Sequence, residues 1–461
     1  MPRTPTADQL RLPFPAAAPA LPLEPDWPPQ PRLWGPSLHP MCSYLASFPA
    51  ALAHAFIARY TRPGDVVVDP FAGRGTTPLQ AVAEGRIGVG NDLNPLAHLL
   101  TAAKVEPAAR AESLTRLATL RLGWSSQAPT WRDLAEAVIR DPGPAGARVP
   151  AAASGSGPAD PHEPVPAEVA IAFHPATFGQ VLAVRAALRL DDRVDRFVAA
   201  ALSGILHGKT AGYLSTVMPN TFSMAPRYVR DFVARTGYQP PERDLFALLE
   251  AKLDRLHRDP LPAGAGIALL GDARDAGTRI GHALAARGLP DRARLVVTSP
   301  PYLRVVKYGY YNWLRNWLLG FDSAAIDAAL DDGHQLDAYL GFLAEVLGGL
   351  RPALAPDAVV VVVVGDVERD RGRESAVGLD LALRVWESAA APAGYALAGE
   401  IVDDVAANRK VTKLWGDEAG RATKLDRILV LGATELGRRR AIAGAALPVD
   451  WDWPPRGLRS L

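Results

Sequence analysis

Cysteine is almost absent from this sequence. Its 461 residues include a single cysteine, Cys42, which excludes a disulfide framework and a zinc site built from cysteines. The 9 histidines are scattered without the spacing of metal ligands. We therefore expect no metal ion.

Long apolar runs are absent too. A membrane-spanning helix needs about 20 consecutive apolar residues, whereas the longest conspicuous run is Ala358–Val364. The first residues are rich in proline and lack the basic stretch and uninterrupted apolar core that mark a secretion signal. These absences predict a cytoplasmic protein that does not contact a membrane.

An excess of one charge is missing as well. Lysine and arginine number 50 and the acidic residues 49, which leaves a formal net charge of +1. A nucleic-acid-binding surface would therefore have to come from local basic patches. Hydrophobic residues make up 48% and charged residues 21% of the chain, a composition typical of globular proteins.

The order of elements predicts an α/β fold divided by an insertion. Residues 1–40 are proline-rich and predict an extended arm, and strand and helix patterns alternate over 41–105 and again over 265–435. Residues 106–264 between them are mainly helical, with a Pro/Gly/Ala tract at about 141–166 that predicts disorder. Residues 436–461 are expected to form a tail. The β-branched runs bounded by helices indicate a mostly parallel, Rossmann-like sheet.

The first group of candidate residues follows the strand expected at 66–68. Gly73 and Gly75 come directly after it, where glycines let the backbone approach a ligand closely, and Asp69 ends the strand. Asp92 ends the next expected strand about twenty residues later. In nucleotide-binding βαβ units, an acidic residue at this position can hold the ribose hydroxyls. Together they predict a site for a nucleoside-bearing cofactor, against the simpler interpretation of a plain turn and a solvated aspartate.

The second group is Thr298-Ser299-Pro300-Pro301-Tyr302, at the end of another expected strand. The two prolines remove backbone donors, which leaves the Ser299 hydroxyl and backbone carbonyls as acceptors. Tyr302 supplies a flat stacking surface. This combination suits an amino group on an aromatic ring, because acceptors that bind its hydrogens favour the more nucleophilic nitrogen.

The strings DPFAGRGTT at 69–77 and TSPPY at 298–302 together resemble the amino-methyltransferases of DNA, and the serine form is most similar to the N4-cytosine branch. The resemblance implies S-adenosyl-L-methionine as methyl donor, double-stranded DNA as substrate and, for some members, a cognate restriction endonuclease as partner. It also implies that Asp69 lies near the methionine portion, that Asp92 holds the ribose and that Asp272 and Ala273 flank the adenine. The implied cofactor-binding set is Asp69, Phe71, Gly73, Gly75, Thr76, Asp92, Asp272 and Ala273, and the implied catalytic set is Ser299, Pro300, Pro301 and Tyr302.

The placement of the insertion makes residues 106–264 the expected target-recognition region. Basic residues there and in two late loops are candidates for phosphate contacts, although each is equally compatible with a solvated surface: Lys209, Arg227, Arg230, Arg409, Lys410 and Lys424. A dense aromatic group, Tyr308 to Trp317, predicts either a wall for an extruded base or ordinary core.

Three other functions stay open at this point. The same acceptors serve the N6 amine of adenine, so serine does not exclude adenine as the target. An RNA base amino-methyltransferase combines similar strings, although Leu303 stands here where that family has glycine. A DNA-binding regulator that kept the fold would show a damaged site, and none of the quoted positions is damaged.

Overall fold

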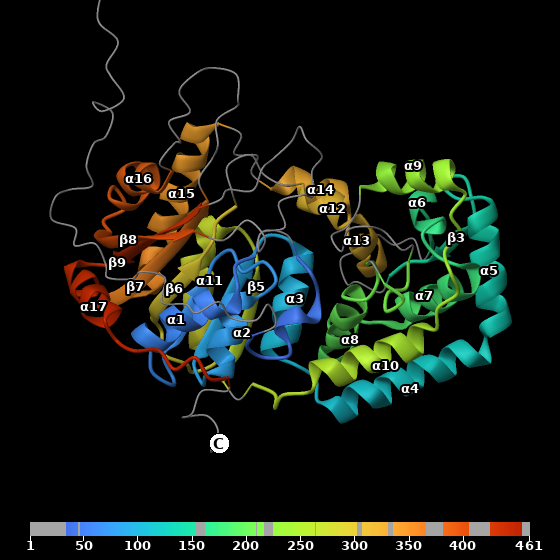
Figure 1. Ribbon diagram of the computed structural model, residues 1–461, viewed down its shortest axis with the longest axis horizontal. Helices are drawn as coiled ribbons and strands as arrows, with labels where there is room; N and C mark the ends of the chain where they lie inside the picture. The colour runs from blue at the N-terminus through green and yellow to red at the C-terminus, as the bar shows by residue number, and fades with distance from the viewer. Residues whose placement is uncertain are drawn as a thin grey trace, which may run out of the picture.

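The computed structural model describes ten stretches of the chain: 34–44, 47–152, 162–208, 210–215, 225–262, 264–301, 307–330, 335–365, 381–404 and 425–453. They comprise a sheet covered by helices and, beside it, a body of helices (Figure 1).

A seven-stranded sheet in the order β5-β2-β1-β6-β7-β9-β8 forms the centre of the first body. Neighbouring strands from β5 to β7 pair in parallel, and β9 runs antiparallel to both β7 and β8. The strands are β1 (Val66–Asp69), β2 (Ile87–Asp92), β5 (Gly266–Leu270), β6 (Ala293–Thr298), β7 (Leu354–Gly365), β8 (Ala396–Asp404) and β9 (Leu425–Gly432). The predicted α/β, mostly parallel, Rossmann-like sheet is confirmed.

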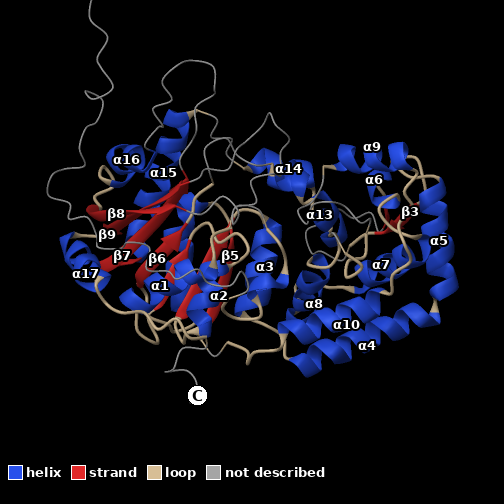
Figure 2. Cartoon of the chain, viewed as in Figure 1, coloured by secondary structure: helices blue, strands red, loops and turns tan. Residues whose placement is uncertain are grey.

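Helices cover both faces of this sheet, which explains its continuous valine runs. Val67 of β1 faces a core formed with α1 and α17, whereas Val66 and Val68 face a core formed with α11 and α15. Figure 2 shows strands enclosed by helices in this way. The helices of this body are α1 (Ala50–Tyr60), α2 (Thr76–Ala83), α3 (Pro95–Val105), α11 (Ala276–Ala286), α15 (Leu336–Leu350), α16 (Leu381–Val385) and α17 (Glu435–Ala445).

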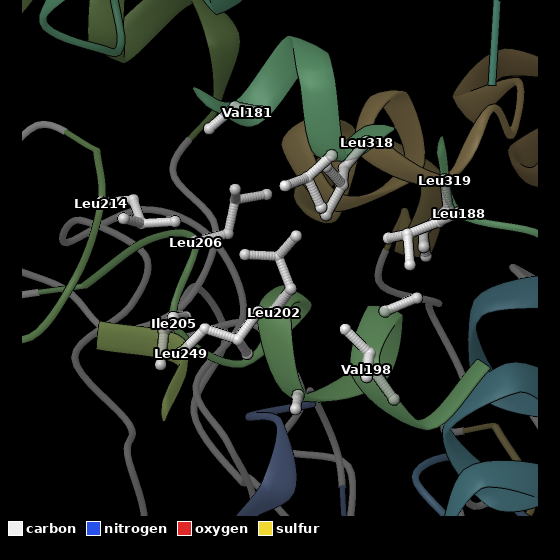
Figure 3. Close-up of a cluster of buried hydrophobic side chains, with 14 of the residues drawn as sticks. Val181, Leu188, Val198, Leu202, Ile205, Leu206, Leu214, Leu249, Leu318 and Leu319 are labelled. Carbon is white, nitrogen blue, oxygen red and sulfur yellow. The ribbon is translucent and has the colours of Figure 1, made fainter. Parts of the chain in front are cut away.

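The insertion after α3 is mainly helical, as predicted. Its helices are α4 (Arg110–Ser126), α5 (Ala128–Arg140), α6 (Ala167–Ala170), α7 (Pro175–Ala187), α8 (Arg193–Ser203), α9 (Pro226–Thr236) and α10 (Leu245–Leu256). Its core is shared with later helices, α12 (Tyr308–Tyr311) and α13 (Trp313–Leu319), which α14 (Ser323–Ala329) follows. Figure 3 shows Leu318 and Leu319 of α13 among insertion side chains such as Leu202. The segment after the second candidate string is therefore built into the insertion.

The tract at 141–166 is not disordered where the structure describes it, so that prediction is wrong for 141–152 and 162–166. Strand β3 (Arg148–Pro150) pairs antiparallel with β4 (His162–Pro164). Val149 and Val165 are fully buried. Buried Arg185 donates to the Pro150 carbonyl over 2.8 Å and pairs with Glu163. A buried guanidinium needs such partners, and this hairpin supplies them.

The described parts of the expected arm and tail are packed as well, which corrects both predictions. The Trp34 indole donates to the Trp451 carbonyl over 3.1 Å, and Leu38 and His39 are buried. Helix α17 packs on β7 and β9. These two segments therefore meet at His54 of α1, where Trp34 and Trp451 both contact its ring and bury aromatic surface. Residues 1–33 and 454–461 lie outside the described residues.

Among the described helices, none combines the length and apolarity that a membrane span requires.

Candidate cofactor and catalytic site

The carboxyl ends of four parallel strands bring the predicted site residues to one edge of the sheet. β1 pairs with β2 on one side and β6 on the other, and β5 pairs with β2. Asp69, Asp92 and Thr298 end three of these strands, and Asp272 follows the fourth. Open α/β sheets bind ligands at this edge.

The glycine turn between β1 and α2 is held by Asp92. One oxygen of its carboxylate accepts the Gly73 amide over 2.7 Å, and the other accepts the Asn94 amide over 2.9 Å. Burial raises the pKa of Asp92 to about 6. The carboxylate thus joins the ends of β1 and β2 and keeps acceptor capacity for a further donor.

Gly75 occupies a position that only glycine fits. Its φ is +76°, in the left-handed region. A Cβ there would meet Oγ1 of Thr101 at 2.9 Å and its Cα at 3.0 Å. Thr76, the first residue of α2, is buried, and its hydroxyl accepts the Arg74 guanidinium over 3.4 Å. The turn is therefore tight, and Thr101 of α3 packs directly against Gly75.

A hydrogen bond between side chains joins the two sequence strings. The Thr298 hydroxyl donates to Oδ1 of Asp69 over 2.6 Å, and the Phe71 amide donates to the same oxygen over 3.0 Å. The Thr77 hydroxyl in turn donates to the Val297 carbonyl over 3.0 Å. Burial raises the pKa of Asp69 to about 7. The first string and the second are thus one structural unit.

An apolar pocket lies at the same junction. Phe71 and Pro300, from the two strings, line it together with residues of α15. Ser299 is half-buried, Pro300 is buried and Pro301 is half-buried. Tyr302 lies outside the described residues.

Asp272 caps the short 3-10 helix Ala273–Asp275 by accepting the Arg274 amide over 2.9 Å. Its other oxygen accepts the Arg274 guanidinium over 2.8 Å. That guanidinium lies 4.9 Å from the centre of the Phe342 ring, which is 5.8 Å from the Phe71 ring. Ala273 is buried. Asp272 and Ala273 therefore lie at the same edge as the glycine turn, and the Gly271 amide donates to the Asp92 carbonyl over 2.9 Å.

Sequence reasoning missed a buried lysine that supports the turn. Lys104 of α3 is fully buried, and its ammonium donates to the Arg74 carbonyl over 2.6 Å and to the His39 carbonyl over 3.3 Å. Burial holds the pKa of Lys104 well below its usual range. The sequence feature that could have indicated it is a single lysine in the mostly apolar segment LLTAAKV at 99–105.

The candidate phosphate contacts are only partly described. Arg227 and Arg230 lie on α9 with side chains 80% and 55% exposed, in ion pairs with Asp231 at 3.7 Å and Glu168 at 3.2 Å. The others lie outside the described residues: Lys209, Arg409, Lys410 and Lys424.

Trp313 and Trp317 are buried in the shared core of the insertion. For these two residues the core interpretation is right, and they are not available as a wall for a base.

Comparisons with known proteins bear on this edge. Residues 30–102 match a family model described as DNA methylase, of the N6 and N4 methyltransferases. That segment contains α1, β1, α2 and β2, and so the glycine turn and Asp92. The predicted architecture, a mostly parallel Rossmann-like sheet with a mainly helical insertion, is confirmed by the strand order and the helices after α3.

Two curated proteins match this chain over segments of 64 and 69 residues, similar in length to the segment that matches the family model. The type II methyltransferase M.Cfr9I of Citrobacter freundii is 39% identical over 64 residues, which are 14% of this chain and 21% of that protein. The type II methyltransferase M.MjaII of Methanocaldococcus jannaschii is 32% identical over 69 residues, 15% of this chain and 13% of that protein. The match thus spans at most 21% of the length of either relative.

The similarity to solved structures is low. TrmN from Thermus thermophilus is 12% identical with a TM-score of 0.28, over 84% of this chain and 50% of its own. The rRNA methyltransferase aviRa from Streptomyces viridochromogenes is 12% identical with a TM-score of 0.29, over 87% and 89%. Similarity this low supports no conclusion about this protein.

Proposed function

We propose that this protein is an S-adenosylmethionine-dependent DNA methyltransferase that modifies the N4 amino group of cytosine. The observation that carries the proposal is the Thr298–Asp69 hydrogen bond of 2.6 Å, because it joins the cofactor-type turn and the Ser-Pro-Pro string at one sheet edge. The match of residues 30–102 to the DNA methylase family supports it.

The residues present suit the cofactor. The left-handed glycines form a tight turn at the carboxyl end of β1, and the Asp92 carboxylate retains acceptor capacity for a ribose hydroxyl. Asp272 and Ala273 would flank the adenine, Phe71 would line the cofactor, and Asp69 would lie near its methionine portion. S-adenosylmethionine would supply an electrophilic methyl group when bound.

The chain's own residues would orient the amine. A cytosine turned out of the duplex would present its amino group to the Ser299 hydroxyl and the Pro300 carbonyl, with Tyr302 stacking on the ring. Two acceptors on the amine hydrogens would direct the nitrogen lone pair toward the methyl group, and fixed positions would lower the barrier. The proposed chemistry requires neither a metal nor a covalent intermediate.

The proposed partners follow from the same reading. We infer double-stranded DNA as substrate, with phosphate contacts from Arg227 and Arg230 and from Lys209, Arg409, Lys410 and Lys424. The relatives named type II methyltransferases suggest a cognate restriction endonuclease as a partner.

Mass spectrometry of nucleosides tests the reaction directly. DNA incubated with the protein and S-adenosylmethionine should contain N4-methylcytosine. N6-methyladenine would transfer the proposal to adenine, methylation of RNA alone would assign an RNA substrate, and no methylation of either would refute an active methyltransferase.

A serine substitution tests the amine acceptor. Ser299→Ala should lower the single-turnover rate on the order of a hundredfold while the affinity for S-adenosylmethionine stays unchanged. Exposed Ser126 on α4 provides the matched control, Ser126→Ala, which should retain the wild-type rate. A wild-type rate for Ser299→Ala would show that another group accepts the amine hydrogens.

A further inference from the structure

Two tyrosines far apart in the sequence stack beside the cofactor turn. Tyr44 precedes α1, and Tyr308 begins α12. Their ring centres are 5.6 Å apart, with planes at 18°. The Tyr44 ring also lies 3.6 Å from the position that a Cβ on Gly73 would take. The stack therefore joins the glycine turn to the first helix after the Ser-Pro-Pro string.

Hydrogen bonds extend this stack to the ribose carboxylate. The side-chain amide of Asn94 donates to the Tyr44 hydroxyl over 2.9 Å. The Asn94 backbone amide donates to Oδ1 of Asp92 over 2.9 Å, and its side-chain oxygen caps α3 through the Leu96 amide. Asn94 is thus fixed at three points and relates the position of Tyr44 to that of Asp92.

Helix α12 is fixed from its other side. The Asp327 carboxylate accepts the Gly309 amide over 2.7 Å and the Tyr310 amide over 2.9 Å. Buried Arg315 donates to Asn312 over 2.7 Å and to the Ser43 hydroxyl over 2.8 Å. Since Ser43 adjoins Tyr44, two separate contacts connect this short segment to α12 and α13.

We propose that Tyr308 is a positioning residue of the methyl-transfer site, which couples the ribose carboxylate to the start of α12 through Tyr44 and Asn94. The inference rests on the proposed function. Neither the glycine turn nor the Ser-Pro-Pro string contains Tyr308, and its ring contacts the cofactor side through a residue that precedes α1. Asn94 joins the Asp92 carboxylate to Tyr44, and the Tyr44 ring stacks on Tyr308. Loss of the Tyr308 ring would therefore displace both the carboxylate proposed to hold the ribose and the segment that resumes after the catalytic string.

The proposal predicts a combined effect on binding and rate. Asp92 should govern cofactor affinity and Ser299 the rate, whereas Tyr308 connects the two and should affect both. Loss of one aromatic stack corresponds to about a fivefold change. Tyr308→Leu should therefore weaken S-adenosylmethionine about fivefold in calorimetry and lower the single-turnover rate at saturating cofactor about fivefold. Tyr308→Phe keeps the ring and should restore both values.

Tyr311 gives the matched control on the same helix. Its ring pairs edge-on with Tyr310, not with Tyr44. Tyr311→Leu should leave affinity and rate within twofold, as ordinary surface packing would. Equal effects of Tyr308→Leu and Tyr311→Leu, or no rescue by Tyr308→Phe, would overturn the proposal.

Tyr44→Phe provides an independent test in case the leucine variant does not fold. It keeps the stack and removes only the hydroxyl that accepts from Asn94. We expect affinity and rate each to fall about threefold, the size of one neutral hydrogen bond, and unchanged values would contradict the coupling. If the wild-type protein does not bind S-adenosylmethionine at all, the proposed function fails; if it binds and Tyr308→Leu matches it, only this inference fails.

Discussion

The cofactor edge of the sheet and helix α9 of the insertion hold their candidate ligand residues in opposite ways. At the edge, Asp69 is buried, and backbone amides of the glycine turn hydrogen-bond to both Asp69 and Asp92. Helix α9 buries only Val229 and leaves Arg227 and Arg230 in solvent. The edge residues are thus held by hydrogen bonds within the protein, whereas the two arginine side chains of α9 are exposed and, among the described residues, held only by ion pairs. Substitutions at the edge should consequently affect folding and binding together, and those on α9 binding alone.

The largest expected effect is that of Gly75→Ala. A left-handed φ of +76° and the 2.9 Å contact with Thr101 oppose any Cβ, so the free energy of unfolding should fall by about 2 kcal/mol or more. Cofactor binding should fall with it, because the turn must shift. Denaturant unfolding and calorimetry measure the two quantities.

Gly123 supplies the control from the insertion. It lies inside α4 with nothing within 4 Å of its added Cβ. Gly123→Ala should raise stability by about 0.5–1 kcal/mol, because alanine favours helix. If the free energy of unfolding changed in the same direction in Gly75→Ala and Gly123→Ala, the glycine turn and α4 would not differ in their tolerance of a Cβ.

The next effect in size is the pH dependence of cofactor affinity. With a pKa of about 6, Asp92 loses its charge as the pH falls through that value, so affinity should weaken by up to about tenfold per unit below it. Stability has the opposite sign: because the folded pKa is raised, this carboxyl stabilises the fold most below about pH 4, and that contribution is lost as the pH rises through 6. Calorimetry from pH 5 to 8 should show the affinity trend.

Asp92→Asn isolates the carboxyl in that measurement. The variant should bind the cofactor weakly and lose the component of the pH trend centred near 6. Persistence of the whole trend would assign it to another group, and buried Asp69, with a pKa of about 7, is then the first candidate.

The smallest expected effect on the fold is that of replacing the α9 arginines. Arg227→Ala with Arg230→Ala, alone or together with Lys209→Ala, should change stability by less than about 0.5 kcal/mol. DNA affinity should fall, and each lost phosphate contact should lower the salt slope by about 0.9. Titrations at several salt concentrations give the slope, and S-adenosylmethionine affinity should stay constant. An unchanged slope would direct the search to Arg409 and Lys424.

The sequence was informative where structure is local. Val66 to Val68, followed by Gly73 and Gly75, predicts the strand and the turn, and both form because the buried run and the left-handed glycines leave few alternatives. The pairing of the two strings at one edge also follows from the rule that parallel strands end together. Site residues at strand ends could therefore be placed from sequence.

Contacts between distant residues could not be predicted in this way. Lys104 reaches the Arg74 carbonyl, and Tyr44 meets Tyr308, only after the sheet and insertion have packed. The tract at 141–166 predicts disorder from its composition, which does not reveal that Arg185 needs partners there. A buried lysine or arginine needs hydrogen-bond partners. Here those partners lie far away in the chain, so no short stretch of sequence contains both the cation and its acceptor.

The insertion also has a consequence for biosynthesis. Asp92 of β2 pairs with Leu270 of β5, although the whole insertion lies between them in the chain. At ribosomal rates of about 5–20 residues per second, the second strand emerges on the order of ten seconds or more after the first. During that interval β2 has one open edge in the nascent protein, and the core of the insertion is also incomplete, because α13 follows β5 in the chain. Completion of this edge of the sheet is thus a late event of synthesis, which waits until the whole insertion has been made.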